Sequence, residues 1–302
     1  MLALVSLKAG AQYDAYFSHY FDLMPAFNPA AAGKDSKLNI AGVYNMSMAG
    51  FEHAPQTAFV TADMPFYFLN CIHGVGLQFM SDKIGLFTHQ RLSAQYALRL
   101  KLGGGYISAG LQAGLLNESF RGSEVDLIDD SDPVFSKSDI SGNALDLGVG
   151  LFYSRKNWYV GLSAQHLTYP TVRLGETNEL KVDGTYYMTG GVTFQLRNPL
   201  WKIATSGIVR SDGIAYRGDV TGRLIYTYDE KMFYGGVTYS PTNSVTVLLG
   251  GRFRGVVIGY SYELYTNGIS LRNGSHELFL GYQTEINIGK KGKNLHQTTR
   301  TL

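Results

Sequence analysis

The sequence predicts an all-β protein that crosses a membrane as one antiparallel, up-and-down β-barrel of about 14 strands. Three observations lead to this prediction. Long segments alternate between apolar and polar side chains. The chain has 36 Gly and 21 Tyr but only 8 Pro, which suits long strands joined by tight turns. The expected connections also alternate between short and long along the chain.

The segment 84–101 shows the alternation clearly. Leu92 and Leu98 fall on one face, and Arg91 and Gln95 fall on the other. Helical spacing would place Leu92 with polar residues, so a strand explains the pattern better. An apolar face opposite a polar face is expected where lipid contacts one side of a barrel wall and a wet lumen the other. The expected lipid-facing set includes Leu92, Tyr96, Leu98, Leu111 and Leu147.

The same pattern, bounded by turn-forming residues, places the strands along the chain. Many of the segments are longer than the five or six residues, roughly, of a strand in a soluble sandwich. Their bounds carry an error of about three residues. The expected strands are 37–49, 55–65, 71–81, 85–101, 104–118, 142–154, 157–168, 184–197, 200–210, 215–229, 231–240, 244–254, 255–266 and 275–289.

The connections fall into two classes by parity. One set is tight, as at Gly103-Gly104 and Asn198-Pro199, whereas the other includes the long segments 119–141, 171–183 and 267–274. Outer-membrane barrels have short periplasmic turns and longer outer loops. We therefore expect an outer-membrane barrel over 37–289 with both chain termini in the periplasm.

Residues 1–11 are expected to form a signal peptide. Leu2 to Leu7 resemble the end of an apolar h-region, and Ala9-Gly10-Ala11 offers a small-x-small cleavage pattern. We expect cleavage after Ala11. No basic n-region precedes the apolar run, which is consistent with a leader truncated at its start. An ordinary apolar strand start is the alternative.

The segment 12–36 precedes the first strand and is rich in aromatic residues. Such a composition does not suit a free linker. We expect it to lie at the periplasmic mouth, to pack in the lumen or to bind another protein. The residues expected to bind a partner are Tyr16, Phe17, Tyr20, Phe27, Asn28 and Pro29.

No pattern in the chain indicates catalysis. The seven His residues are scattered, and Cys71 is the only cysteine, so neither a metal-ligand spacing nor a disulfide is predicted. The formal net charge of +2 gives no support to nucleic-acid binding. We expect a protein that is not an enzyme and that has no cofactor.

Two charged segments leave alternatives open. The loop 118–142 carries a cluster of Asp and Glu residues that either binds Ca²⁺ or is a solvated surface loop. The basic tail 290–302, which we expect in the periplasm, either contacts an acidic partner or is a free end.

Two motifs near the N-terminus have a distinctive spacing: Tyr13-Asp14-x-x-Phe17-Ser18-x-Tyr20, then Phe27-Asn28-Pro29-Ala30-x-x-Gly33. Further stretches follow along the chain: Pro55-Gln56-Thr57, Asp63-Met64-Pro65, Gly74-Val75-Gly76 and Val160-Gly161-Leu162-Ser163-Ala164-Gln165-His166-Leu167. Together they resemble the PorP/SprF family over most of the chain.

This resemblance implies an outer-membrane component of the type IX secretion system of Bacteroidota. That system exports proteins with C-terminal signals and, in gliding species, delivers adhesins to the surface. The resemblance implies a scaffold or anchor without catalytic residues. A channel or transporter for small solutes is the alternative function.

The resemblance also implies partners besides outer-membrane lipids. They are a periplasmic lipoprotein with a peptidoglycan-binding domain (PorE/SprE type), the PorK/PorN ring proteins, and the type IX translocon barrel or a secreted protein with a type B C-terminal signal.

Overall fold

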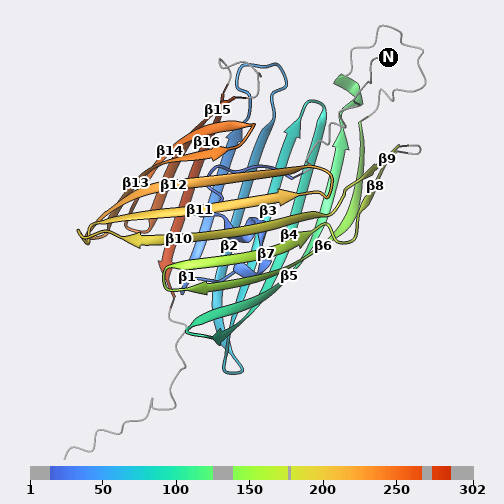
Figure 1. The fold of residues 1–302 in the computed structure, drawn as a ribbon. Coiled ribbons are helices and arrows are strands. Elements are labelled where there is room, and N and C mark those ends of the chain that lie inside the picture. The colour runs from blue at the N-terminus through green and yellow to red at the C-terminus, as the bar shows by residue number, and fades with distance from the viewer. Residues whose placement is uncertain (1–13, 125–138, 176–177, 267–273, 287–302) are drawn as a thin grey trace, which may run out of the picture.

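The computed structural model describes residues 14–124, 139–175, 178–266 and 274–286. Within them, fourteen antiparallel strands close into a barrel (Figure 1). Neighbours in the chain are neighbours in the wall, except that β7 pairs with β10, and β1 closes the ring on β16. The strands of the wall are β1 (Lys37–Met46), β2 (Gln56–Phe68), β3 (Cys71–Ile84), β4 (Phe87–Leu102), β5 (Gly105–Phe120), β6 (Ile140–Arg155), β7 (Trp158–Gln165), β10 (Thr185–Gln195), β11 (Trp201–Ser211), β12 (Tyr216–Tyr228), β13 (Lys231–Ser240), β14 (Ser244–Phe253), β15 (Val256–Tyr265) and β16 (Ser275–Glu285).

This architecture confirms the predicted barrel and its strands. Among the described residues the largest differences are three residues, at the ends of β1, β2, β3 and β7, which stop at Met46, Phe68, Ile84 and Gln165 rather than at 49, 65, 81 and 168. The expected end of the last strand, at 289, lies outside the described residues. After Met46 the chain turns at once, with positive φ at Met48 and His53, so pairing cannot continue.

One hairpin lies within 171–183, which the sequence pattern predicts to be a long connection. β8 (Thr171–Leu174) and β9 (Asn178–Lys181) form a separate two-stranded sheet between β7 and β10. The side chains of Val172 and Leu174 are buried, and the β8 backbone packs closely on Gly142 of β6. Four residues with one alternation are too few to separate a strand from a loop by periodicity.

The two faces of the wall follow the predicted alternation. Leu92 and Leu111 are 57% and 61% exposed on the outer face, whereas Arg91 and Gln112 are 5% and 2% exposed on the inner face. Because pairing aligns Gln95 with Gln112 and Tyr96 with Leu111, neighbouring strands present the same kind of side chain to the same side. Tyr96 and Leu147 are also exposed outward, and Leu98 is half-buried.

The two ends of the barrel differ in their connections. The short-turn end carries 69–70, 103–104, 156–157, 196–200, 229–230 and 254–255 between strands. The long-loop end carries 47–55, 85–86, 121–139, 166–184, 212–215, 241–243 and 266–274. Tyr153 with Trp158 and Trp201 with Tyr226 form ring pairs beside the short turns, which suits an interfacial aromatic girdle.

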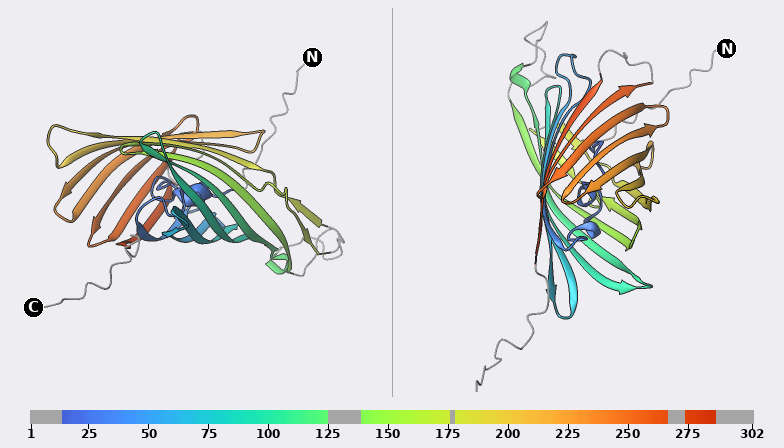
Figure 2. Two further views of the ribbon diagram at one scale, coloured as in Figure 1. Left: turned by 90° about the horizontal axis from the view of Figure 1, so that it is seen from below. Right: turned by 90° about the vertical axis from the view of Figure 1, so that its left-hand side faces the viewer.

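The N-terminal segment runs inside the ring of strands, as both views in Figure 2 show. It contains one helical turn, α1 (Met24–Phe27), followed by the 3-10 turn η1 (Pro29–Ala31). No helix in the described part of the chain is long and apolar enough to cross a membrane. The main hydrophobic core lies between this segment and the inner wall, and includes Tyr20, Leu23, Phe59, Phe152 and Phe279.

Candidate functional site

The candidate site is the contact between the lumen wall and residues 14–36, which we call the plug. The plug begins beside the long-loop end, where Asp14 contacts Arg91 near the start of β4. It ends at the short-turn end, where Arg99, near the other end of β4, donates a hydrogen bond to the Lys34 carbonyl oxygen. The plug therefore crosses the lumen along most of one wall.

Aromatic side chains anchor the middle of the plug. The ring of Phe17 lies 6.1 Å from that of Phe27 and 5.2 Å from that of Phe59 on β2. Tyr20 is fully buried, and its hydroxyl lies 3.1 Å from Ser206 Oγ and donates to Thr221 Oγ1 at 3.0 Å. Each such buried ring contributes about 1.5–3 kcal/mol, so a few of them are enough to hold the segment in the lumen.

Asn28 joins the plug to two wall strands at once. Its Nδ2 donates to the carbonyl oxygens of Leu151 on β6 and Leu162 on β7, at 2.9 and 3.2 Å. Its Oδ1 accepts from the Ala30 amide at 2.9 Å, which caps η1. The contact is possible because Gly150 has no side chain: a Cβ there would lie 2.0 Å from Asn28 Oδ1.

Inner-wall glutamines bind the backbone of α1. Gln95 Nε2 donates to the Pro25 carbonyl oxygen at 2.7 Å, and Gln165 Nε2 donates to that of Ala26 at 2.9 Å. Gln112 Oε1 in turn accepts from Gln95 Nε2 at 2.8 Å. The polar side chains of the inner face thus hydrogen-bond to the plug. At this level of the barrel, backbone carbonyl oxygens of the plug are hydrogen-bond partners of the inward-facing amides.

A charged cluster holds the start of the plug. The Asp14 carboxylate lies 3.1 Å from His166 Nε2 and 3.5 Å from Arg91 Nη1, and accepts a hydrogen bond from Tyr187 at 2.6 Å. His166 Nδ1 also lies 3.1 Å from Asp146 Oδ1. Burial opposes ionisation of Asp14, but the neighbouring cations hold the pKa of its carboxyl well below the usual range.

A second carboxylate binds the next turn of the plug. Glu277 on β16 is buried and accepts from the backbone amides of Ser18 and His19 at 2.7 and 2.9 Å. The same carboxylate lies 2.6 Å from His19 Nδ1. Charge-assisted hydrogen bonds of this kind are stronger than neutral ones, so Glu277 fixes the backbone direction here.

The plug leaves the lumen through a close contact of two glycines. Gly33 has a φ of +64°, and its amide donates to Asp63 Oδ2 at 2.8 Å. A Cβ on Gly74 would lie 1.9 Å from the carbonyl oxygen of Ala32. The backbone therefore passes the wall at a separation that only glycine allows.

All six residues predicted to bind a partner lie in the plug. Phe17, Tyr20, Phe27, Asn28 and Pro29 are buried against the wall, and Tyr16 is partly buried under the guanidinium of Arg217, 3.8 Å from its ring. Partner binding by these six residues stays a prediction. Their observed contacts are with the barrel itself.

Sequence reasoning left the wall half of this site unassigned. Alternation places Gln95 on the inner face, but nothing in a single strand indicates what an inward amide will bind. The available signal was the number of inward polar residues and glycines opposite an aromatic segment. The wall residues that bind the plug include Asp63, Gly74, Gln95, Gly150, Gln165, His166 and Glu277.

The other segments singled out by the sequence are mostly not described by the structure. Most of the acidic loop, at 125–138, lies outside the described residues, as do the expected signal peptide and the basic tail. Within the described ranges, no group of His, Cys, Asp and Glu side chains is arranged to hold a metal ion. In the described part of this loop, Asp139 accepts hydrogen bonds from the amide and hydroxyl of Ser123.

The comparisons with known proteins decide the family. The family model described as type IX secretion system membrane protein PorP/SprF matches residues 9–282. The chain belongs to the PorP/SprF family. No curated protein matches it. Together with the closed barrel, this membership makes the chain an outer-membrane component of type IX secretion, and it places the chain in no known class of enzyme.

Solved structures share the barrel fold at low sequence identity. A CymD monoaromatic hydrocarbon channel aligns with a TM-score of 0.52 and 9% identity, over 88% of this chain and 92% of that one. The P. putida toluene transporter TodX gives a TM-score of 0.44 and 8% identity, over 83% and 89%. The KdgM porin gives 0.35 and 12%, over 81% and 98%. At these identities the first likeness shows the fold alone, and the other two carry no argument.

Proposed function

We propose that this PorP/SprF protein is a scaffold or anchor barrel, closed by its own plug, for the export or surface attachment of proteins with C-terminal secretion signals. The observation that carries the proposal is the plug–wall contact. Tyr20, Leu23 and Ala31 have no solvent exposure although they lie in the centre of a membrane barrel. A lumen filled in this way does not suit a diffusion channel for solutes.

A scaffold presents surfaces rather than a pore. The short turns lie at one end of the barrel, and the β8–β9 hairpin lies near the other, so each end offers one such surface (Figure 1). We propose that the short-turn end faces the periplasm, following the general asymmetry of outer-membrane barrels. Periplasmic partners of the kinds expected for the family, a PorE/SprE-type lipoprotein and the PorK/PorN ring proteins, would then meet the short-turn end.

Affinity purification from native outer membranes tests this proposal. We expect wild-type protein to retain a periplasmic partner, and deletion of the gene to abolish export of proteins with C-terminal signals. Normal export without the protein would contradict the proposed function.

A double variant tests whether the plug is needed for partner binding and export. Phe17→Ala with Tyr20→Ala removes two buried rings, and we expect a membrane-inserted, heat-modifiable barrel that loses partner retention and export. Tyr216→Ala with Tyr228→Ala is the control, because those two rings are 83% and 60% exposed rather than buried against the plug. If the plug variant fails to insert, the plug is a folding element instead.

A further inference from the structure

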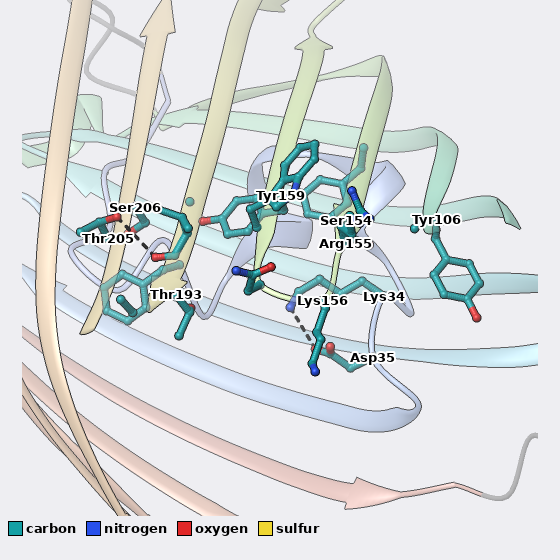
Figure 3. Close-up of a pocket in the computed structure, with 18 of the residues that line it drawn as sticks. Lys34, Asp35, Tyr106, Ser154, Arg155, Lys156, Tyr159, Thr193, Thr205 and Ser206 are labelled. Atoms are coloured by element: carbon teal, nitrogen blue, oxygen red, sulfur yellow. Dashed lines mark hydrogen bonds and ion pairs between the residues drawn. The ribbon is translucent and has the colours of Figure 1, made fainter. Parts of the chain in front are cut away.

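A cavity of about 510 Å³ lies at the short-turn end, beside the point where the plug leaves the lumen. Figure 3 shows Lys34, Asp35 and Lys156 on one side of it and the side chains of Tyr159 and Ser206 on another. A volume of this size is within the range of ligand sites. Three plug residues, Phe21, Lys34 and Asp35, line part of the cavity.

The cavity is strongly cationic. Five basic side chains line it against the single carboxylate of Asp35, which pairs with Lys34 at 3.0 Å. The basic residues are Lys34, Arg99, Arg155, Lys156 and Arg223. Among the described residues that line the cavity, the basic side chains therefore outnumber the carboxylates, and the lining carries a net positive charge.

Aromatic rings hold two of these cations in place. Arg99 lies 4.2 Å from the ring centroid of Tyr106, and Arg223 lies 3.4 Å from that of Phe21 in the plug. Stacking of this kind orients a guanidinium while leaving the N–H groups at its edge for hydrogen bonds, one of which Arg99 already donates to the Lys34 carbonyl oxygen. The cations are therefore partly preorganised before a ligand arrives.

Two residues that line the cavity each have a buried polar atom without a hydrogen-bond partner among the described residues. The atoms are Arg223 Nε and Tyr159 Oη. Buried donors are normally satisfied, and an unfilled one is a reason to look for a missing ligand or water. The hydroxyls of Ser154, Thr193 and Ser206 offer further hydrogen bonds around them.

We propose that this cavity binds an acidic peptide segment of a partner protein. Lipid headgroups do not suit the site, because the wall is closed and the outer faces of β6 and β7 carry exposed Leu151 and Leu162. The chain's own C-terminal tail does not suit it either, since Lys290, Lys291 and Lys293 carry the same charge as the cavity. Complementary charge across the contact favours an acidic partner.

This inference rests on the proposed scaffold role, but it is tested on the purified full-length protein. A fluorescein-labelled hexaglutamate peptide is titrated in detergent and followed by fluorescence anisotropy, with hexaserine for comparison. We expect hexaglutamate to bind more tightly than hexaserine, and the difference to shrink as salt screens the charges. Arg155→Gln with Lys156→Gln removes two exposed cations from the rim without touching the plug.

The matched control is Lys231→Gln with Arg254→Gln, which removes the same charge from the short-turn end outside the cavity. We expect the cavity variant to weaken binding by about tenfold and the control to change it little. Equal weakening by both variants, or no preference for hexaglutamate, would overturn the proposal. Competition by inorganic phosphate as strong as by unlabelled peptide would overturn it as well, and would assign the site to small anions.

An export assay with the same variants separates the two proposals. One outcome is that deletion of the gene abolishes export, whereas the cavity variant loses peptide binding but still supports export. The cavity then binds peptide for a purpose other than secretion. If hexaglutamate never binds although export depends on the protein, only the cavity proposal fails.

Discussion

Asp14 and His166 form a buried ion pair that ties the start of the plug to the residue after β7, with Oδ1 and Nε2 3.1 Å apart. Burial opposes protonation of His166, but the carboxylates of Asp14 and Asp146 raise its pKa to about 9, from 6.5 in the absence of these contacts. The charged and titratable groups around the pair are Arg91, Asp146, Tyr187 and Arg210.

This pair predicts that the protein loses stability on the alkaline side. His166 is protonated in the folded protein up to about pH 9, whereas in the unfolded chain it loses its proton near 6.5. Its contribution is therefore complete below pH 6.5 and disappears between pH 6.5 and 9. We expect the temperature of the heat-modifiable gel shift to fall across this range. His166→Gln should flatten that pH dependence, and an unchanged slope in the variant would show that the pair does not hold the plug.

The second prediction concerns the fit of the plug to the wall glycines. A Cβ on Gly110 would lie 2.3 Å from the Ala30 amide nitrogen, so Gly110→Ala must displace η1. Overpacking of this kind costs about 1–3 kcal/mol. Denaturant unfolding in detergent measures the change. Gly222→Ala is the control, because a Cβ there meets nothing within 4 Å. Equal stability of the two variants would mean that the plug does not sit against β5 as described.

The third prediction tests the lipid-facing register. Leu111 is 61% exposed in the middle of β5, and Leu111→Arg should lower the free energy of unfolding by about 2–4 kcal/mol in a bilayer. Leu102 is similarly exposed at 54% but ends β4 at the short turn, so Leu102→Arg should cost at most about 1 kcal/mol. Reversed costs would place the hydrocarbon layer elsewhere on the wall.

The strands were predictable because each one carries its own signal. In a segment such as 105–120, the alternation of apolar and polar residues predicts both the length of the strand and which side chains face outward. A tight turn such as Gly103-Gly104 marks where the strand begins. Alternation also places Gln95 on the inner face. It failed only for β8 and β9, where the strands are too short to show a period.

The plug was foreseeable in its composition but not in its contacts. The aromatic residues of 12–36 had to be buried somewhere, yet the sequence left the lumen and a partner equally open. The choice depends on long-range pairs, such as Asn28 with Leu151 or Ser18 with Glu277, which join residues far apart in the chain. Such pairs leave no local pattern, because a buried carboxylate and a solvated one look alike in a sequence.

Single-channel conductance in planar lipid bilayers shows whether the plug closes the barrel. The plug keeps Tyr20, Leu23 and Ala31 fully buried in the lumen, so purified wild-type protein should insert without stable conductance steps. A variant that lacks residues 14–32 should conduct, because it removes the plug and keeps every wall strand. Steady, ohmic conductance from the wild-type protein would contradict the account and favour a solute channel.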